Sequence, residues 1–474
     1  MQIHERDNVE ILLHPENGIP AGHKRALRPI AEGEDIIKYG CPIGHATRHI
    51  AKGEWVDERN ICTNLQGTLA YNWNPQPCQT PSSLPLPAAT FRGYLRHDGQ
   101  AGIRNHIWII PTVGCVASLA QRLAADFQRV CGYPTLAFAH TFGCSQLGCD
   151  HARTRQMLCS LISHPNAGGV LVLGLGCENN QLSTLREMLE RKIDPSRVRF
   201  LEAQKVEDEY QEGLSLLAEL KAIAEKDERR NLPLSMLRIG LKCGGSDGFS
   251  GITANPLLGR LSDTLVTEGA TTVLTEVPEM FGAETLLMNR CQDEATFYKT
   301  VRLINDFKEY YLSHGLPVGE NPSPGNKAGG ISTLEEKSLG CVQKGGTAPV
   351  VDVLDYGQPL QKQGLNLLCA PGNDLIASTA LAASGCQIVL FTTGRGTPFG
   401  TCVPTLKIST NNTLAQQKPH WIDFNAGCLL TGIPWEEATR QILHLVIHTA
   451  SGDPTRNETN GYHEIAIWKD GVTL

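Results

Sequence analysis

Short apolar runs separated by glycines fill the first part of the chain. Residues 9–13 and 35–40 both read as β-like runs. The turns around these runs carry Gly22, Gly33, Gly40, Gly44 and Gly53. Short runs bounded by turn residues are typical of strands. The pattern therefore predicts a compact, mostly β module over residues 1–65.

Residues 66–90 lack this pattern and are rich in proline. Prolines recur in residues 75–77 and 81–87, and no apolar periodicity runs through the segment. Such a composition is typical of an extended connection. We therefore expect a linker between the β module and the rest of the chain.

After residue 90, continuous apolar runs end in glycine and alternate with helix-compatible stretches. The runs at residues 107–114 and 169–176 are the clearest, and residues 272–275 and 387–394 are further strand candidates. Helical stretches run from the 180s to Arg191 and over residues 211–226. Continuous apolar runs of this kind indicate parallel strands that are covered by helices on both faces. The fold class expected for the whole chain is multidomain α/β.

A charged segment at residues 225–231 divides this α/β region. It is followed by Leu232 and Pro233, after which the strand and helix pattern resumes. We place a domain boundary there, which gives a middle α/β domain at 91–230 and a C-terminal domain at 231–474. A length of 474 residues agrees with this division, because about two to four domains are expected for it.

Composition and charge exclude several classes of function. Hydrophobic residues make up 41% of the chain and charged residues 19%, which is globular composition. The net charge is -7 and no Lys/Arg-rich run occurs, so we expect no nucleic-acid partner. The first residues lack a signal-peptide pattern, and no apolar stretch approaches the roughly 20 residues that span a bilayer. These features predict a cytoplasmic protein with no membrane contact.

Sixteen cysteines are spread through the chain without a CxxC pair. In a reducing compartment we expect free thiols, most of them buried as small apolar side chains. Five of them stand in glycine-bearing loops: Cys115, Cys144, Cys177, Cys243 and Cys341. They either fit tight strand-to-loop corners or gather as thiolates around iron. The second alternative includes an iron–sulfur cluster on three cysteines with one iron open to a substrate hydroxyl.

Several loops are dense in polar side chains. Arg96 and Arg104 flank a glycine-containing turn and together would clamp a carboxylate, although a solvated hairpin explains them equally well. The loops at residues 176–181, 243–248, 321–327 and 393–397 offer the donors and acceptors that a polyhydroxylated ligand needs. Ordinary turns are the alternative explanation for these loops.

Many of these segments resemble the altronate dehydratase family, which includes galactarate dehydratase. The resemblance rests on motifs in the same order along the chain: Gly22-His23-Lys24, residues 38–44, Arg104-Asn105, and residues 111–115, 140–146, 174–180, 241–247 and 321–327. It extends to the last residues, 469–474. The number of separate motifs makes the resemblance specific.

The resemblance implies an architecture and a reaction. The architecture is a small N-terminal β-clip module of the antifreeze-like type, a middle α/β domain and a larger, Rossmann-like C-terminal domain. The reaction is the loss of water from D-altronate, which gives 2-dehydro-3-deoxy-D-gluconate, with iron(II) or sometimes manganese(II) as the metal. A homodimer is the expected assembly, because it is the commonest one for soluble enzymes.

The candidate site residues follow from these motifs. Family members often carry histidines where this chain has residues 55–60, so Asp57 is expected to join His23 as a metal ligand. Recognition of the carboxylate and hydroxyls of a small sugar acid is assigned to Arg104, Asn105, Asn179, Lys327 and Arg395. Proton transfer is assigned to Asp247, His140 or Lys24. The alternatives are a dehydratase for another acid such as galactarate, and a sugar-acid-binding protein without catalysis.

Overall fold

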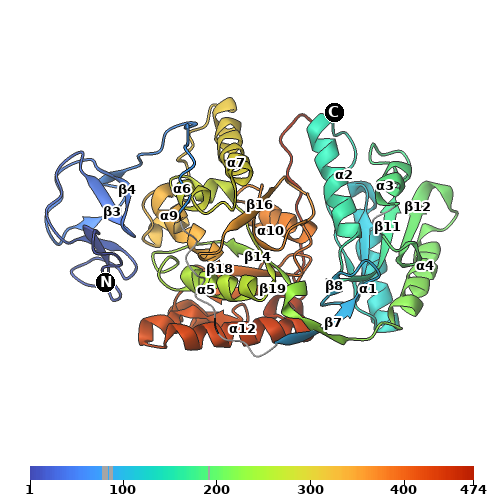
Figure 1. The fold of residues 1–474 in the computed structure, drawn as a ribbon. Coiled ribbons are helices and arrows are strands. Elements are labelled where there is room, and N and C mark those ends of the chain that lie inside the picture. The colour runs from blue at the N-terminus through green and yellow to red at the C-terminus, as the bar shows by residue number, and fades with distance from the viewer. Residues whose placement is uncertain (77–83, 85–88, 191–192) are drawn as a thin grey trace.

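The computed structural model describes residues 1–76, 84, 89–190 and 193–474. It arranges the chain as three bodies in a row (Figure 1). The N-terminal module lies at one end, the residues after 234 form the central body, and the middle domain lies at the other end. Most of the proline-rich part of the predicted linker, and Arg191 at the end of a predicted helix, lie outside the described residues.

The N-terminal module is built from two small antiparallel sheets, which confirms the prediction of a mostly β unit. One sheet contains β1 (Val9–Ile11), β2 (Lys24–Ala26) and β5 (Trp55–Val56). The other contains β3 (Asp35–Lys38), β4 (Cys41–Ala46) and β6 (Ile61–Cys62). Four isoleucines that are fully buried between them form the core: Ile30, Ile36, Ile43 and Ile50.

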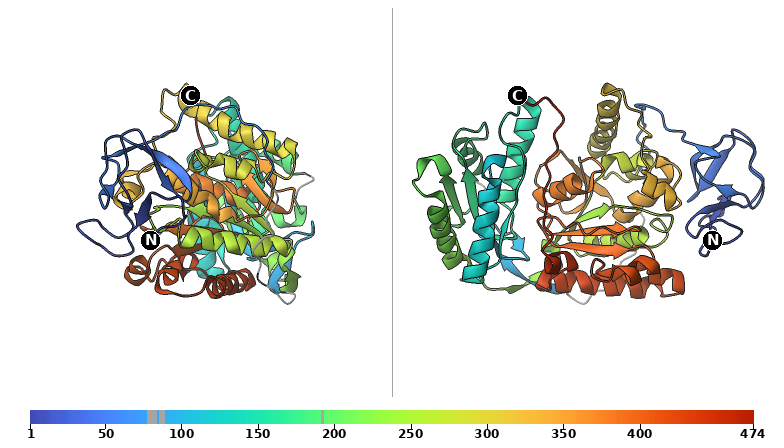
Figure 2. Two further views of the ribbon diagram at one scale, coloured as in Figure 1. Left: turned by 60° about the vertical axis from the view of Figure 1, so that its left-hand side comes forward. Right: turned by 180° about the vertical axis from the view of Figure 1, so that it is seen from behind.

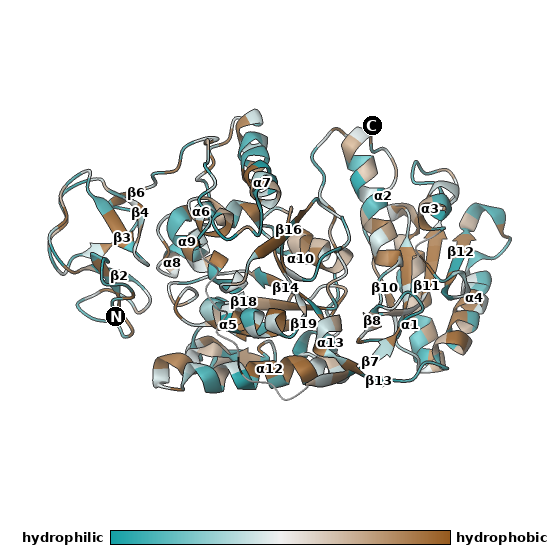
Figure 3. Cartoon of the chain, viewed as in Figure 1, coloured by the Kyte–Doolittle hydropathy of each residue, from teal (hydrophilic) through white to brown (hydrophobic). Residues whose placement is uncertain are grey.

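The middle domain has a parallel sheet in the order β10-β9-β11-β12. Its strands are β9 (His106–Pro111), β10 (Thr135–Ala137), β11 (Ala167–Gly174) and β12 (Val198–Glu202). Its helices are α1 (Ala117–Cys131), α2 (Gly148–Ile162), α3 (Leu182–Leu189) and α4 (Glu209–Ala224). All eight residues of β11 are buried, and Figure 3 colours this strand mainly as hydrophobic. Because successive side chains of β11 join different core clusters, both faces of the sheet are covered.

A short antiparallel sheet joins the middle domain to the central body. It contains β7 (Thr90–Leu95), β8 (Ala101–Gly102) and β13 (Arg230–Pro233). Strand β7 begins the α/β region, and β13 pairs with it where the chain leaves the middle domain. The chain therefore enters and leaves this domain at neighbouring strands.

The central body contains a seven-stranded parallel sheet in the order β16-β17-β15-β14-β18-β19-β20. The strands are β14 (Arg238–Cys243), β15 (Thr271–Leu274), β16 (Val350–Leu354), β17 (Gly364–Leu368), β18 (Ile388–Thr393), β19 (Thr405–Ser409) and β20 (Phe424–Asn425). The sheet grows outward in one direction from β14 and in the other from β18. Between these strands lies the switch point, where ligands bind in open α/β sheets.

Helices cover both faces of this sheet (Figure 1). They are α5 (Ala254–Thr267), α6 (Glu284–Met288), α7 (Glu294–Ser313), α8 (Pro324–Ala328), α9 (Leu334–Cys341), α10 (Asp374–Ala383), α11 (Asn412–Gln417), α12 (Trp435–Ser451) and α13 (Arg456–Asn460). Helix α9 lies beside the N-terminal module and contacts β4. Across the described residues, no helix has both the length and the apolar character that crossing a membrane requires.

Candidate active site at the domain junction

The carboxyl ends of β14 and β18 bring two of the polar loops together. Asp247 follows β14, and Gly394 and Arg395 follow β18. A Cβ on Gly394 would lie 2.2 Å from the Cγ atom of Asp247, so the Asp247 carboxylate packs directly on the backbone of the second loop. This contact lies at the switch point of the seven-stranded sheet.

Asp247 is buried and accepts several hydrogen bonds. The hydroxyl of Thr410 donates to both carboxylate oxygens at 2.9 Å. The Ser250 hydroxyl at 3.0 Å, the Asn411 amide at 3.0 Å and the Phe249 N–H at 3.1 Å complete the set. Burial raises the pKa of Asp247, although these donors act in the opposite direction.

The N-terminal module packs on this loop. A Cβ on Gly248 would lie 1.8 Å from the carbonyl oxygen of Gly22, so only glycine fits there. The ring Nε2 of His23 lies 3.3 Å from the carbonyl oxygen of Ala328 at the end of α8. His23 and Asp247 therefore belong to one junction between two bodies. We use the term junction site for His23, Lys24, Asp57, Asp247, Lys327 and Arg395.

Lys24 and Lys38 hold the module on the central body through one carboxylate. The Lys24 ammonium lies 2.8 Å from one oxygen of Glu336, and the Lys38 ammonium lies 2.6 Å from the other. Lys24 also donates to the Gly330 carbonyl and the Ser332 hydroxyl. Burial alone would raise the pKa of Glu336, but the two ammonium groups hold it at about 2. Lys24 thus has its three donors occupied in a fully buried ion network.

His23 and Asp57 are neighbours whose side chains have other partners. The His23 ring packs edge-on against Trp55, with 5.1 Å between the ring centroids. Arg59 binds both carboxylate oxygens of Asp57 through Nε and Nη2, at distances between 2.6 and 3.0 Å. Burial and the Lys24 charge lower the pKa of His23, which favours its neutral ring. A neutral ring is the form that binds metals or takes up a proton.

Lys327 and Arg395 supply the cationic side chains of the junction site. Lys327 lies in α8, next to the Ala328 carbonyl that contacts His23. Arg395 is exposed, and its Cβ lies close to Gly245 in the Asp247 loop. Within the described part of the chain, neither side chain takes part in an ion pair. Both are therefore available to an anionic ligand.

Behind the junction, a thiol–carboxylate group formed by Cys243, Glu279 and Cys341 is buried. The two sulfur atoms lie 3.3 Å apart, and Glu279 Oε2 lies 3.0 Å from Cys243 Sγ and 3.1 Å from Cys341 Sγ. Among the described residues, this is the group of three donors that is close enough to hold a metal ion. His23 and Asp57 do not belong to it.

Lysines surround this group and connect it to the junction. The Lys337 ammonium lies 2.8 Å from Glu279 Oε1 and donates to Asn326 at 3.2 Å. Asn326 in turn donates to the carbonyl of Ser246, the residue before Asp247. Burial would raise the pKa of Glu279, but Lys337 and its neighbouring lysines hold it at about 2. Lys242 forms a further buried ion pair with Glu276.

Two of the sequence-predicted residues lie in the middle domain instead. His140 follows β10, and both of its ring nitrogens contact backbone groups, the Pro111 carbonyl at 2.7 Å and the Phe142 N–H at 3.2 Å. The Asn179 side chain accepts a hydrogen bond from the Ser145 N–H at 2.9 Å. The middle domain and the N-terminal module lie at opposite ends of the molecule (Figure 2). Within one chain, His140 therefore does not meet Asp247.

The predicted carboxylate clamp at Arg104 and Asn105 is a structural contact. All five N–H donors of Arg104 are used by the Glu458 carboxylate and by the carbonyls of Ile103, Thr449 and Asp453. Asn105 accepts a hydrogen bond from Arg96 and donates one to the Ala224 carbonyl. A pocket of about 240 Å³ lies beside Arg104, between the middle domain and the central body. These side chains fix the domain interface and leave no donor for a substrate.

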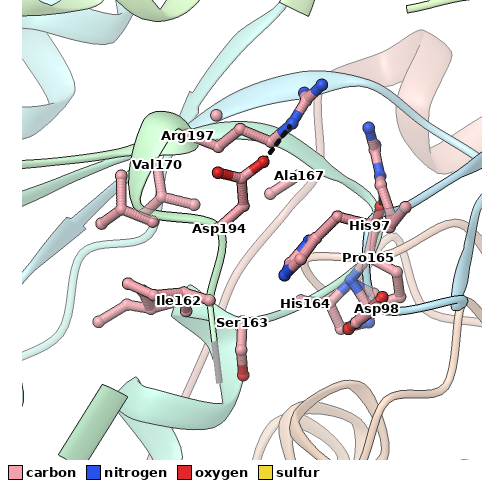
Figure 4. Close-up of a pocket in the computed structure, with 14 residues that line it drawn as sticks. His97, Asp98, Ile162, Ser163, His164, Pro165, Ala167, Val170, Asp194 and Arg197 are labelled. Atoms are coloured by element: carbon pink, nitrogen blue, oxygen red, sulfur yellow. Dashed lines mark hydrogen bonds and ion pairs between the residues drawn. The ribbon is translucent and has the colours of Figure 1, made fainter. Parts of the chain in front are cut away.

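A smaller cavity of about 50 Å³ in the middle domain is not lined by Asp247, His23 or the other residues of the junction site. Figure 4 shows that Asp194 and Arg197, which line it, are paired with each other. Arg197 and Arg96 also bind Asp227. Of the residues that the sequence predicted for ligand binding, Arg96 lines this cavity, and its guanidinium is taken up by Asp227 and by other protein groups.

Sequence reasoning missed the acidic and basic partners at the junction. Glu279, Glu336, Lys337 and Lys344 are nearly or completely buried. In the sequence, the charges of α9 look like an ordinary solvated helix face, which is the usual environment of such residues. The only signal in the sequence was that two lysines, Lys337 and Lys344, flank Cys341. Their burial makes this arrangement unusual, and the sequence does not show that burial.

The expectation that most cysteines are buried is wrong. Those that are buried are Cys159, Cys243, Cys291, Cys341, Cys386 and Cys402. Among the described residues, an equal number of cysteines are exposed: Cys62, Cys115, Cys131, Cys144, Cys149 and Cys177. No disulfide joins the described cysteines. The difference arises because four of the exposed thiols stand in the loops and first helical turn beyond the carboxyl ends of the middle-domain strands.

The fold and the site are those of a multidomain α/β enzyme. Its small N-terminal module packs on the switch point of a parallel sheet. Family models extend this to the whole chain. Residues 1–64 match an altronate/galactarate dehydratase SAF domain, residues 93–225 match the second domain of D-galactarate dehydratase/altronate hydrolase, and residues 234–473 match a D-galactarate/altronate dehydratase C-terminal domain. The chain belongs to the altronate/galactarate dehydratase family of hydro-lyases.

Relatives with this architecture cover the full length. The chain is 54% identical to an altronate dehydratase of Bacillus subtilis, over 100% of this chain and 99% of that protein. It is 51% identical to an altronate dehydratase of Escherichia coli, over 99% and 94% of the two chains. Identity to the galactarate dehydratase (L-threo-forming) of Escherichia coli is 35%, over 95% and 92%.

Proposed function

We propose that this chain dehydrates D-altronate to 2-dehydro-3-deoxy-D-gluconate and water. The observation that carries the proposal is the identity of 51% to 54% with altronate dehydratases over nearly the whole of each chain. The lower identity of 35% to a galactarate dehydratase favours altronate over the diacid. Asp247, Lys327 and Arg395 at the junction supply the proton-transfer and anion-binding groups that this reaction needs.

The reaction removes a proton from C2 and hydroxide from C3, and the resulting enol ketonises. We assign the proton transfer to Asp247. Burial raises the pKa of its carboxyl group towards the working pH, which is the property that suits a group that gives and takes protons. Asp247 also lies at the contact between the N-terminal module and the central body, where a bound acid would be shielded from water.

We assign the carboxylate of the substrate to Lys327 and Arg395. Their positive charges have no ion-pair partner among the described residues, whereas Lys24 and Lys38 are neutralised by Glu336. An arginine can hold a carboxylate with two parallel hydrogen bonds, and a lysine adds a point charge. Asn179 lies in the middle domain and has no role in this assignment.

The thiol–carboxylate group has a donor set that fits a divalent metal. Its three donor atoms lie 3.0 to 3.3 Å apart, and Glu279 is held as a carboxylate with a pKa of about 2. Two sulfur ligands favour iron(II) over manganese(II), which prefers oxygen and nitrogen. When bound, such a metal would act as a Lewis acid towards an oxygen of the substrate. His23 and Asp57 remain the alternative ligands.

Substitutions distinguish the two metal sites. Cys341→Ser should lower the content of iron that exceeds acid-labile sulfide at least tenfold, and His23→Ala should leave this excess iron unchanged. Cys386→Ser is the matched control, because Cys386 is a buried thiol in the same body but precedes β18 at the opposite edge of the sheet. Loss of the excess iron in His23→Ala but not in Cys341→Ser would instead identify His23 and Asp57 as the metal ligands.

Turnover tests the function directly. Enzyme purified without oxygen receives D-altronate or D-galactarate, with iron(II), manganese(II) or a chelator, and the 2-keto-3-deoxy product is assayed. Product from altronate that is lost with chelator is the expected result. Product from galactarate alone would show that galactarate, and not altronate, is the substrate. Binding of either acid without turnover under any metal would favour a sugar-acid-binding protein.

Asp247→Asn tests the proton-transfer assignment. The variant should lose about 100-fold or more in kcat, the usual contribution of a positioned acid or base. Asp263→Asn is the control, because burial also raises the pKa of Asp263, and that residue lies in α5, where it binds the Thr347 backbone. Equal activity in the two variants would remove Asp247 from the mechanism.

We extend the proposal to the architecture and the setting of the enzyme. Strands that grow in both directions from β14 and β18 support a Rossmann-like C-terminal domain, and the SAF match supports a β-clip module of the antifreeze-like type. The domain limits near residues 65, 90 and 230 are retained. A homodimer and a cytoplasmic location are predicted from base rates and composition.

A further inference from the structure

The five cysteines in glycine-bearing loops fall into two separate groups. Cys243 and Cys341 belong to the buried thiol–carboxylate group. The other three follow strands of the middle-domain sheet: Cys115 after β9, Cys144 after β10 and Cys177 after β11. Because β9 lies between β10 and β11 and all three run parallel, their carboxyl ends meet at one edge. The three cysteines therefore share that edge.

Direct hydrogen bonds hold the three loops together. The Gly114 N–H donates to the Phe142 carbonyl at 3.0 Å, which joins the Cys115 and Cys144 loops. The Asn180 N–H donates to the Gly143 carbonyl at 3.0 Å, and its side-chain amide donates to the Thr112 carbonyl at 3.1 Å. Each cysteine-bearing loop is thus bound to the other two.

Two of these loops contain a glycine in the left-handed region of backbone conformation, which favours glycine. Gly143 has a φ of 103°, and a Cβ there would lie 2.0 Å from the Thr112 carbonyl oxygen. Gly176 has a φ of 130°, and a Cβ there would lie 2.7 Å from the side chain of Gln204. Both glycines directly precede a cysteine. The left-handed glycines therefore fix the backbone immediately before Cys144 and Cys177.

The three thiols are exposed, and two buried polar atoms in the same loops have no hydrogen-bond partner. Cys115, Cys144 and Cys177 are all exposed. In the Cys144 loop, the amide nitrogen of Gln146 has no hydrogen-bond partner although the residue is 2% exposed. The side-chain oxygen of Asn180, in a fully buried residue, also lacks one. Buried polar atoms without partners are uncommon and indicate a missing ligand or water.

We propose that Cys115, Cys144 and Cys177 bind an iron–sulfur cluster at the switch point of the middle domain. Cysteine thiolates are the usual ligands of such clusters, and nearby N–H groups stabilise the cluster sulfides. Three thiolates suit a four-iron cluster and keep one iron for a ligand from outside the protein. That ligand is an oxygen donor such as the carboxylate or hydroxyl of a small acid, because switch-point loops bind polar ligands.

This site is distinct from the junction site. Within one chain, the central body separates the middle domain from the N-terminal module (Figures 1 and 2). The inference does not depend on altronate being the substrate or on the metal of the thiol–carboxylate group. Cluster binding and altronate turnover can therefore fail independently.

The test measures iron and acid-labile sulfide in full-length enzyme that is purified or reconstituted without oxygen. The wild type should contain nearly equal amounts of both, with broad visible absorbance and an electron paramagnetic resonance signal after reduction. Single substitutions of Cys115, Cys144 or Cys177 by serine should each lower the sulfide content at least fivefold. Iron without sulfide, zinc alone, or no metal in the wild type would overturn the proposal.

Two exposed cysteines of the same domain serve as controls. Cys131 is the last residue of α1, a helix that leads away from the sheet edge carrying the three proposed ligands. Cys149 lies in the first turn of α2. Cys131→Ser and Cys149→Ser should both keep the wild-type sulfide content. Full sulfide loss in Cys149→Ser but not in one of the three proposed ligands would overturn the ligand set.

Alkylation of the wild type covers the case in which a serine variant fails to fold. Iodoacetamide treatment without oxygen, followed by peptide mass spectrometry, should label Cys131 and Cys149 and leave Cys115, Cys144 and Cys177 protected. Removal of iron with a chelator should then expose these three thiols. Equal labelling of all five thiols before chelation would contradict the proposal.

Discussion

The buried lysines and the buried glutamate between the N-terminal module and α9 are stable because they neutralise one another. Glu336 accepts hydrogen bonds from both Lys24 and Lys38, and the Ser332 N–H donates to the same carboxylate oxygen as Lys24. Removing one partner of such a network leaves an unpaired buried charge, which costs about 3 to 5 kcal/mol. The two lysines come from the N-terminal module and the glutamate from α9. This carboxylate is therefore a main determinant of how the module sits on the central body.

The pKa of Glu336 predicts how stability depends on pH. Its pKa is about 2 in the folded protein against 4.5 when it is unperturbed. The stabilisation is therefore complete above about pH 4.5 and is lost as the pH falls towards about 2, with a total of about 3 kcal/mol. Chemical unfolding at about pH 6 and about pH 3 should show a smaller acid-induced loss for Glu336→Gln than for the wild type.

Glu58→Gln is the control for this measurement, because Glu58 is an exposed residue of the same module. It should reproduce the wild-type loss. An unchanged pH dependence in Glu336→Gln would show that this carboxylate does not couple protonation to folding.

Arg104 and Arg395 should respond in opposite ways to the same substitution. Arg104→Lys removes the paired contact to Glu458 and should lower the free energy of unfolding by about 2 kcal/mol, with KM for altronate unchanged. Arg395→Lys should leave stability unchanged and raise KM about tenfold, because the exposed guanidinium is assigned to the substrate. The checks are denaturant titration and steady-state kinetics. A raised KM with unchanged stability in Arg104→Lys would restore the clamp that the sequence predicted.

At the scale of elements, the sequence predicts most of what local patterns determine. The apolar runs at residues 107–114, 169–176, 272–275 and 387–394 correspond to β9, β11, β15 and β18. The helix expected at residues 211–226 is α4, Glu209–Ala224. Strands that are buried on both faces need apolar residues at nearly every position. A single sequence is therefore enough to identify them.

The site was less predictable because its contacts span most of the chain. Lys24 and Glu336 are 312 positions apart, and His23 and Ala328 are 305 apart. No local pattern specifies which glycine loop faces which charged helix. The sequence grouped His140 and Arg104 with Asp247, whereas the fold places them in other parts of the molecule.

Gly143 should be the most sensitive position in the middle-domain loops. Gly143→Ala places a Cβ 2.0 Å from the Thr112 carbonyl oxygen and keeps a left-handed φ, so it should lower the free energy of unfolding by about 3 kcal/mol or more. Gly132→Ala has a left-handed φ but nothing within 4 Å, and should cost about 1 kcal/mol. Thermal unfolding of the two variants measures the difference. Equal costs would mean that the Thr112 and Cys144 loops do not pack as described.

At the scale of the whole molecule, the last residues connect two bodies. Trp468 stacks on Phe307 of the central body, with 5.4 Å between the ring centroids. The chain then reaches the middle domain, where the N–H groups of Asp470 and Gly471 donate to the Asp150 carboxylate at 3.0 and 2.7 Å. Thr473 pairs with Gln146 in the loop that carries Cys144. Residues 468–474, which we call the strap, thus link the central body to the edge of the middle-domain sheet that carries Cys115, Cys144 and Cys177.

Asp150 accepts two of the hydrogen bonds that hold residues 468–474 on the middle domain. Asp150→Ala removes two charge-assisted hydrogen bonds, each worth about 1.5 to 3 kcal/mol, and should release the strap without unfolding α2. Hydrogen exchange followed by mass spectrometry should therefore speed up at least tenfold in residues 143–149 and 468–474. Exchange in β14 and β18, which lie in the middle of the central-body sheet, should not change.

Asp126→Ala provides the matched control, because Asp126 is also a helical carboxylate of the middle domain but pairs with Arg129 and Tyr210 on its own domain. Its exchange pattern near residue 145 should equal that of the wild type. Faster exchange in the strap alone, with residues 143–149 unchanged, would mean that the Cys144 loop is held by the Cys115 and Cys177 loops and not by the C-terminal segment. In that case, the middle domain would keep its loop structure independently of the central body, and loss of the strap would alter only the relative position of the two bodies.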